Sequence, residues 1–135
     1  MNRTIMKVVA TPLAVMAALS ALAPAVMAEG SWYSYISGGR PGFTSRTWTK
    51  NVNDGAATQI GHSSCDRNTA TYALYKKQWW GSEQRNIIRY GCGWREHSMG
   101  SQDSGNYFFA ITKIDGNSYI PTAGSVNVPS VWVKY

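Results

Sequence analysis

Residues 106–117, with the sequence NYFFAITKIDGN, carry the clearest indication of the fold. Residues 106–114 are rich in aromatic and β-branched side chains, which favour strands. The Asp115-Gly116-Asn117 run that follows is the best hairpin signal in the chain, because Asp-Gly and Gly-Asn pairs tolerate the positive φ of a type I′ turn. We therefore expect a strand over 106–114, a tight turn, and a return that begins at 118–120.

The same pattern of strands and turns recurs along the chain beyond residue 28. Period-two alternation predicts further strands at 31–37, 43–50, 57–63, 69–80, 84–90 and 125–135, with a short segment around Trp94. Turns or loops rich in glycine or polar residues separate them at 38–42, 51–55, 81–83, 98–105 and 121–124. No useful stretch shows the 3.6-residue period of an amphipathic helix. The sequence thus predicts an all-β fold, a small antiparallel β-sandwich or partly open barrel of seven to eight strands.

Two details set local expectations. Pro129 cannot donate a hydrogen bond to a ladder, so the last strand should lie at a sheet edge or carry a bulge. The strand aromatics that have apolar neighbours on their own face are expected in the core: Trp48, Tyr72, Phe108 and Trp132.

The first 28 residues have the features of a cleavable secretory signal peptide. Arg3 and Lys7 form a short basic region, and an uncharged, largely apolar run follows. Val26 and Ala28 are the small residues expected before a signal-peptidase site. An uncleaved anchor is the alternative, but the apolar core is shorter than the roughly 18–20 residues that span a membrane. We expect cleavage after Ala28, which releases a secreted domain of residues 29–135 without a transmembrane segment.

The charge of this domain is moderately positive. Cleavage removes two basic residues and lowers the net charge from +6 to +4. The remaining basic residues are scattered, whereas nucleic-acid-binding proteins cluster them. A positive charge of this size favours encounter with anionic envelope polymers or acidic partners, and it also aids solubility. We expect no specific nucleic-acid partner, and we expect a monomer.

Cys65 and Cys92 are the only cysteines in the chain. In an oxidising compartment such a pair predicts one disulfide. The alternatives are free thiols or half of a metal site, but no CxxC is present and the two histidines complete no zinc spacing. We expect no metal and no cofactor. A tight turn at 81–83 would not place the cysteines opposite each other, so either the turn is wider or bulged, or the disulfide joins the loop before the 69–80 strand to the end of its neighbour.

The chain resembles a group of small exported proteins with two cysteines that is common in actinobacteria, and several shared motifs carry this resemblance. They are SRTW at 45–48, DGAAT at 54–58 before the first cysteine, a tryptophan shortly after the second cysteine, and GNYFF at 105–109. The resemblance covers most of residues 29–135 and implies the β fold and the disulfide. It implies no activity, because the shared motifs are structural.

Aromatic residues are the richest functional signal. The chain holds six Trp, eight Tyr and three Phe, and exposed Trp and Tyr on a sandwich stack on sugar rings or anchor protein partners. A small core filled with large residues is the alternative. We select as ligand-binding candidates two aromatic groups and two arginines that add polar or cation–π contacts: Trp32, Tyr33, Tyr35, Trp79, Trp80, Arg85 and Arg89.

Arg95, Glu96 and His97 are the best local candidates for catalysis, because all three side chains can act in acid–base chemistry. On a strand, however, Glu96 would face away from the other two. No nucleophile elbow, phosphate loop or calcium loop is present. We therefore expect a protein that binds an extracellular protein or a cell-wall polymer, as an antimicrobial or inhibitor-like factor would. A small secreted hydrolase of the ribonuclease type and a structural cell-envelope protein are the alternatives.

Overall fold

The computed structural model describes residues 28–135, so residues 1–27 of the expected signal peptide lie outside the described part. This part of the chain forms eight strands and one short helix: β1 (Ser31–Gly39), β2 (Trp48–Lys50), β3 (Ala57–His62), β4 (Thr69–Gln78), β5 (Gly81–Gly91), β6 (Arg95–Ser101), β7 (Gly105–Ile114), α2 (Ile120–Ala123) and β8 (Val126–Lys134). The all-β prediction is confirmed.

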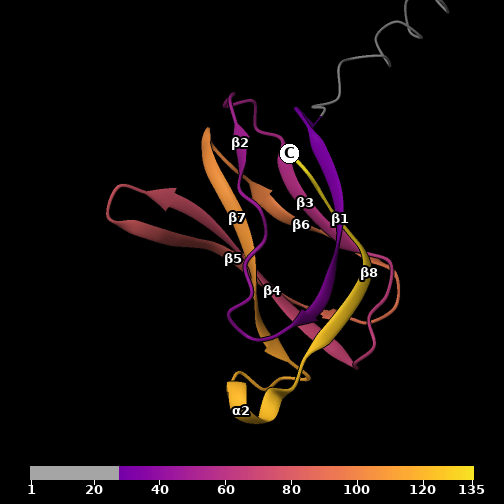
Figure 1. Cartoon of the computed structure of the whole chain (residues 1–135). Coiled ribbons are helices and arrows are strands. Elements are labelled where there is room, and N and C mark those ends of the chain that lie inside the picture. The colour runs from indigo at the N-terminus through magenta and orange to yellow at the C-terminus, as the bar shows by residue number, and fades with distance from the viewer. Residues whose placement is uncertain (1–27) are drawn as a thin grey trace, which may run out of the picture.

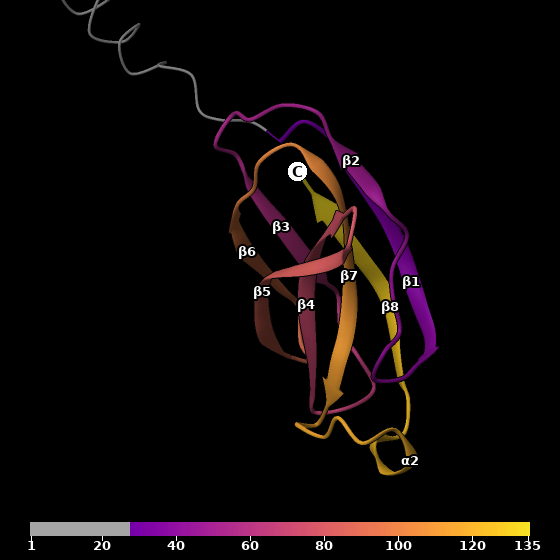
Figure 2. The same cartoon turned by 90° about the vertical axis from the view of Figure 1, so that its left-hand side faces the viewer.

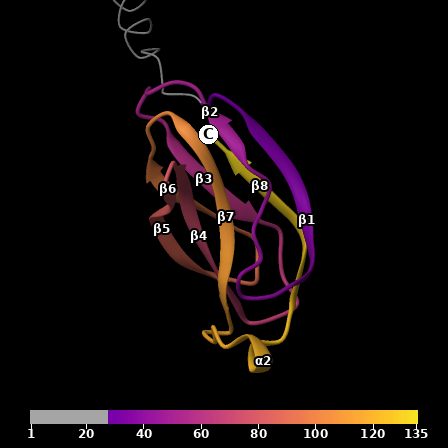
Figure 3. The same cartoon turned by 60° about the vertical axis from the view of Figure 1, so that its left-hand side comes forward.

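The strands form two antiparallel sheets of four strands each (Figure 1). The first sheet has the order β1-β8-β3-β6 and the second has the order β2-β7-β4-β5. Figure 3 shows β1 and β8 on one side and β4 and β7 on the other, with α2 below them. The predicted β-sandwich is therefore the architecture of the described chain.

The core between the sheets is dense in aromatic rings. Trp32 of β1 stacks on Phe109 of β7, with ring centroids 6.1 Å apart, and Tyr72 meets Phe109 edge to face at 5.4 Å. Such offset and edge-to-face pairs add to the free energy of burial. Trp48 and Tyr72 are buried as expected. Phe108 is only partly buried and stacks on Tyr75 outside this core, so its predicted place there was wrong.

The hairpin signal at Asp115-Gly116 is confirmed in its turn. Asp115 has φ +52° and Gly116 has φ +78°, the sign that a type I′ turn requires at both positions. Ile114 and Asn117 exchange two backbone hydrogen bonds across it. The return strand expected from residue 118 is wrong, because the chain instead enters α2 and then crosses to the other sheet as β8.

Pro129 lies at a bulge, as one of the two expectations stated. Ser34 pairs with Val131 and Ile36 pairs with Val128, so Pro129 and Ser130 together oppose the single residue Tyr35. The other expectation, an edge strand, is wrong, because β8 lies between β1 and β3. The missing amide hydrogen is tolerated there because β3 pairs with β8 only from Val131 onward.

Three predicted boundaries are wrong. The hairpin after β4 turns at Trp79-Trp80 rather than at 81–83, since Gln78 pairs with Gly81. Residues 43–47 form no regular strand, because the Ser45 hydroxyl accepts the Phe109 amide hydrogen in place of a backbone carbonyl. The predicted polar loop at 98–105 begins late, since β6 continues to Ser101.

The disulfide Cys65–Cys92 is present. The Cys65 amide donates to the Cys92 carbonyl at 3.0 Å, and the Cys92 amide donates to the Asn68 carbonyl at 3.2 Å. The first cysteine lies in the loop before β4 and the second follows the end of β5. Of the two geometries considered from the sequence, the disulfide therefore adopts the one that joins this loop to the end of the neighbouring strand.

Candidate functional site

Trp79 and Trp80 form the tip of the β4–β5 hairpin, which stands away from the two layers in Figure 1 and points toward the viewer in Figure 2. Trp79 is 92% exposed and Trp80 is 60% exposed. Their rings meet edge to face, with centroids 5.4 Å apart. The two indoles thus form one exposed apolar unit at the end of an arm.

The turn itself does not require tryptophan. Primed two-residue turns favour Asn and Gly because both central residues take positive φ. Here Asp115 is the only non-glycine residue with positive φ in the described part of the chain, and the positive φ of this hairpin belongs to Gly81. Neither folding propensity nor the core explains the two indoles.

Arg85 and Arg89, the two arginines predicted to accompany the indoles, have different positions. The Arg85 guanidinium donates to Glu83 at 2.6 Å and to Gln102 at 3.0 Å, and it lies 3.6 Å from Asp103. It therefore ties the arm to the loop after β6. Arg89 is exposed and nine residues beyond Trp80 on β5, roughly 30 Å along the strand, so it does not join the tip.

The three aromatic candidates on β1 divide between the two faces of its sheet. Trp32 is buried against Phe109, whereas Tyr33 and Tyr35 are exposed. The Arg46 guanidinium lies 5.4 Å from the centre of the Trp32 ring, a cation–π distance. The structure thus places Trp32 in the core and leaves the two tyrosines free to contact a ligand.

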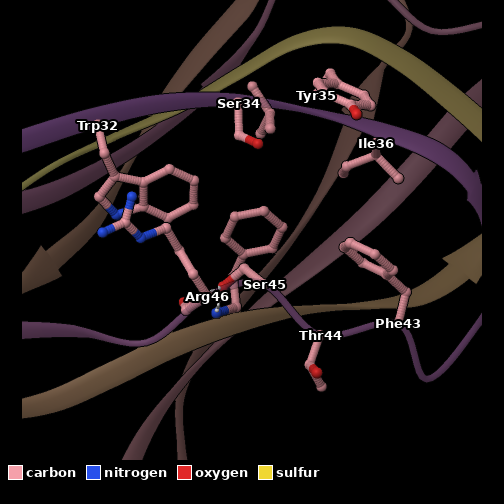
Figure 4. A pocket seen from close by; sticks show the side chains of 10 residues that line it. Trp32, Ser34, Tyr35, Ile36, Phe43, Thr44, Ser45 and Arg46 are labelled. Atoms are coloured by element: carbon pink, nitrogen blue, oxygen red, sulfur yellow. Dashed lines mark hydrogen bonds between the residues drawn. The ribbon is translucent and has the colours of Figure 1, made fainter.

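A small cavity lies beside Trp32 (Figure 4). β1 passes on one side with Ser34 and Ile36, and the segment from Phe43 to Arg46 passes on the other. Its volume is about 100 Å³, below the 300–1,000 Å³ or so of sites for drug-sized ligands. The cavity therefore suits only a few atoms. It lies at the β1 edge of the sandwich, whereas Trp79 and Trp80 extend from the β5 edge, so the two predicted aromatic groups do not form one site.

Arg95, Glu96 and His97 lie on β6 and point to both faces of the sheet. His97 pairs with the buried Ile60 and packs its ring against Tyr90, with centroids 4.5 Å apart. Glu96 pairs with Gly61 and faces outward, where the Trp132 indole N–H donates to its carboxylate. The structure therefore does not bring Glu96 and His97 together, as strand alternation predicts.

His62 is fully buried, and both of its ring nitrogens have partners. Nδ1 lies 3.0 Å from the Tyr72 hydroxyl and Nε2 lies 2.8 Å from the Gly91 carbonyl. A carbonyl only accepts, so Nε2 carries the hydrogen and Nδ1 accepts from the hydroxyl. Burial lowers the pKa of His62 below its ordinary value of 6.5. This arrangement holds a neutral imidazole in the core.

Tyr33, a predicted candidate, belongs to an aromatic group on the outer face of the β1-β8-β3-β6 sheet whose other members, Trp132 and Trp94, were not predicted to bind a ligand. Trp132 is buried at 6% exposure between Tyr33 and Trp94, with ring centroids 5.9 and 5.7 Å away. Without a bulge, Trp132 shares the inward parity of Val126 and Val128, which is why a core position was expected. The bulge at Pro129 inserts one residue, so Val131 and Val133 point into the core and Trp132 points out.

Within residues 28–135, no group of three or more His, Cys, Asp or Glu side chains could hold a metal ion. No helix in the same part of the chain has the length and hydropathy needed to cross a membrane.

No family model and no curated protein matches the chain. Among solved structures it is similar to PirA, with a TM-score of 0.48 and 8% identity over 84% of this chain and 97% of that one. It is also similar to CpGH89 from Clostridium perfringens (TM-score 0.41, 11% identity, 78% of this chain, 14% of that one). A third is infectious bursal disease virus, Gx strain (TM-score 0.34, 10% identity, 83% of this chain, 34% of that one). At these identities and TM-scores the comparisons assign neither a family nor an activity to the chain.

Proposed function

We propose that the protein acts by binding an extracellular or cell-envelope target, with the Trp79-Trp80 tip as its anchor. The observation that carries this proposal is the exposure of two adjacent indoles at the end of a projecting hairpin. Tryptophan dominates the binding energy of many interfaces when a partner buries it. The disulfide supports an oxidising compartment, where such a target would be met.

The arm is suited to present the indoles because it is braced. Arg85 links it to Gln102 and Asp103, and Lys76 forms an ion pair with Asp103 at 2.9 Å. Both contacts lie at the base of the hairpin, where β4 still pairs with β7. A braced arm loses less conformational entropy on binding than a mobile loop does. Hydrolysis by Arg95, Glu96 and His97 has no comparable support, because Glu96 and His97 face opposite sides of β6.

The test is retention of the secreted protein on purified cell walls, on envelope polysaccharide and on extracellular proteins. We expect Trp79→Ala and Trp80→Ala each to weaken binding to at least one of these targets about 30-fold, which corresponds to the roughly 2 kcal/mol of a hot-spot residue. Tyr119→Ala is the matched control, since Tyr119 is also an exposed aromatic but lies next to α2, toward the opposite end of β4 from the tip. All three side chains are exposed, so the melting temperature should not change.

Two results would contradict the proposal. One is retention on every bound target that survives in a Trp79→Ala, Trp80→Ala double variant. The other is RNA cleavage by the purified protein that Glu96→Ala or His97→Ala abolishes, since that would support the hydrolase alternative.

A further inference from the structure

The outer face of the β1-β8-β3-β6 sheet carries two rows of side chains that the strand register sets side by side. One row contains Tyr33, Trp132, Gly61 and Glu96, each paired with the next across the sheet. The neighbouring row contains Ser31, Lys134, Gln59 and Ser98. Residues two apart on a strand share a face and lie about 7 Å apart. An aromatic row therefore lies beside a row of hydrogen-bonding groups.

Gly61 lets the Trp132 ring lie across β3. A Cβ on Gly61 would come within 2.3–2.5 Å of three atoms of the indole, a distance that real side chains do not reach. The Trp132 indole N–H donates to Glu96. The ring is thus fixed by the backbone beneath it and by a hydrogen bond at its edge, and it supports the two rings that flank it.

The flanking rings are the exposed ones. Tyr33 is 64% exposed and Trp94 is 62% exposed. Their planes are tilted by 36° and 39° from the plane of Trp132. Trp94 comes directly before β6 and Tyr33 lies on β1, the strands at the two edges of the sheet. A rigid support with an exposed ring on each side is a preorganised stacking surface, because little order is lost when a ligand covers it.

The polar groups beside the rings are electrically balanced. Lys134 Nζ lies 3.0 Å from Glu96 Oε2, and the Trp132 N–H meets the same oxygen. Burial alone would raise the pKa of Glu96, but the hydrogen bonds from Trp132 and Lys134 outweigh it and lower the pKa. The carboxylate therefore stays charged and paired, with Oε1 left to accept a hydroxyl from a ligand. A balanced ion pair favours a neutral partner over an anionic one.

We infer that this face binds neutral polysaccharide: pyranose rings stack on Tyr33 and Trp94, while their hydroxyls bond to Glu96, Gln59 and Ser98. A sugar ring has an apolar face and a polar rim, which match the aromatic row and the polar row. A lipid surface would bury the Lys134–Glu96 ion pair among apolar groups that cannot form hydrogen bonds with it. A nucleic acid would require cations that are not already paired with a carboxylate. The site is separate from the Trp79-Trp80 tip and does not depend on the function proposed for it.

Calorimetric titration of the secreted protein with chitohexaose and with cellohexaose tests the inference. We expect at least one of the two neutral oligosaccharides to bind. Tyr33→Ala and Trp94→Ala should each weaken that binding at least tenfold without lowering the melting temperature, since both rings are exposed. Trp79→Ala should leave it unchanged, which distinguishes this site from the hairpin tip.

Three outcomes would overturn the inference. The first is the absence of binding to both oligosaccharides. The second is sugar binding that Trp79→Ala abolishes and Trp94→Ala preserves. The third is Trp94→Ala releasing the protein from an extracellular protein partner while neither oligosaccharide binds, because the face would then be a protein interface.

Discussion

At the scale of single residues, two buried positions have environments that few other side chains could share. Gly61 lies directly under the Trp132 ring, and His62, its neighbour on β3, faces the opposite way into the core between Tyr72 and Gly91. Adjacent strand residues point to opposite faces, so Gly61 lies on the outer face of the sheet and His62 lies in the core.

Gly61→Ala should lower the free energy of unfolding by about 1–3 kcal/mol, the range for overpacked sites. The added methyl group collides with the Trp132 ring, which must then move. Urea denaturation measures the change. In a Trp132→Leu background the same substitution should cost much less, because the indole that it meets is gone. An equal loss of unfolding free energy in the two backgrounds would show that the added methyl group does not act through the Trp132 ring.

His62 should make the fold sensitive to mild acid. Its pKa is lowered in the folded state, mainly by burial, so the unfolded chain binds the proton more readily. Stability is therefore complete above the ordinary value of 6.5 and is lost as the pH falls below it, by up to about 1.4 kcal/mol per pH unit. Asp66, Asp103, Asp115 and Glu96 also have lowered pKa values, but they act only below their ordinary values of 3.8–4.5.

Chemical denaturation at several pH values between 5 and 7 measures the slope of the free energy of unfolding against pH. His62→Gln removes the titrating ring and should flatten the slope, although the variant is less stable overall. An unchanged slope in His62→Gln would show that another group takes up the proton.

At the scale of elements, Arg85 adds a side-chain connection between the β4–β5 hairpin and the loop after β6, beside the pairing of β4 with β7. The guanidinium contacts Glu83 on the arm and Gln102 and Asp103 in the loop after β6. Hydrogen bonds to charged groups contribute more than neutral ones, of the order of 1.5–3 kcal/mol before solvent screening, and this side chain is only about a quarter exposed.

Arg85→Ala should loosen the arm locally. We expect hydrogen exchange at the amides of residues 82–84 to accelerate about fivefold, which corresponds to roughly 1 kcal/mol of local opening. Arg89→Ala is the control, because Arg89 is an exposed arginine on the same strand. If both variants exchange alike, Arg85 does not brace the arm.

At the scale of the whole molecule, the disulfide links the loop before β4 to the end of β5. The cysteines are 27 positions apart, and closing a loop of that size in the unfolded chain stabilises the fold by about 3.5 kcal/mol in the chain-entropy model. The replacement Cys65→Ala with Cys92→Ala should lower the free energy of unfolding by about this amount in urea. The unchanged protein under reducing conditions should lose a similar amount, and a loss well below 1 kcal/mol in both would contradict the prediction.

The elements that depend on local chemistry could be predicted from the sequence. Period-two alternation, turn residues and a lone cysteine pair act over a few residues or through covalent bonding, so they predicted the sandwich, the Asp115-Gly116 turn and the disulfide. The face that Trp132 occupies and the positions of the Trp79 and Trp80 indoles could not be predicted, because they depend on how distant strands pair. One inserted residue at Pro129 reverses the face of every later side chain on β8. The two-residue turn depends on pairing between β4 and β5 rather than on Gly81-Ser82-Glu83.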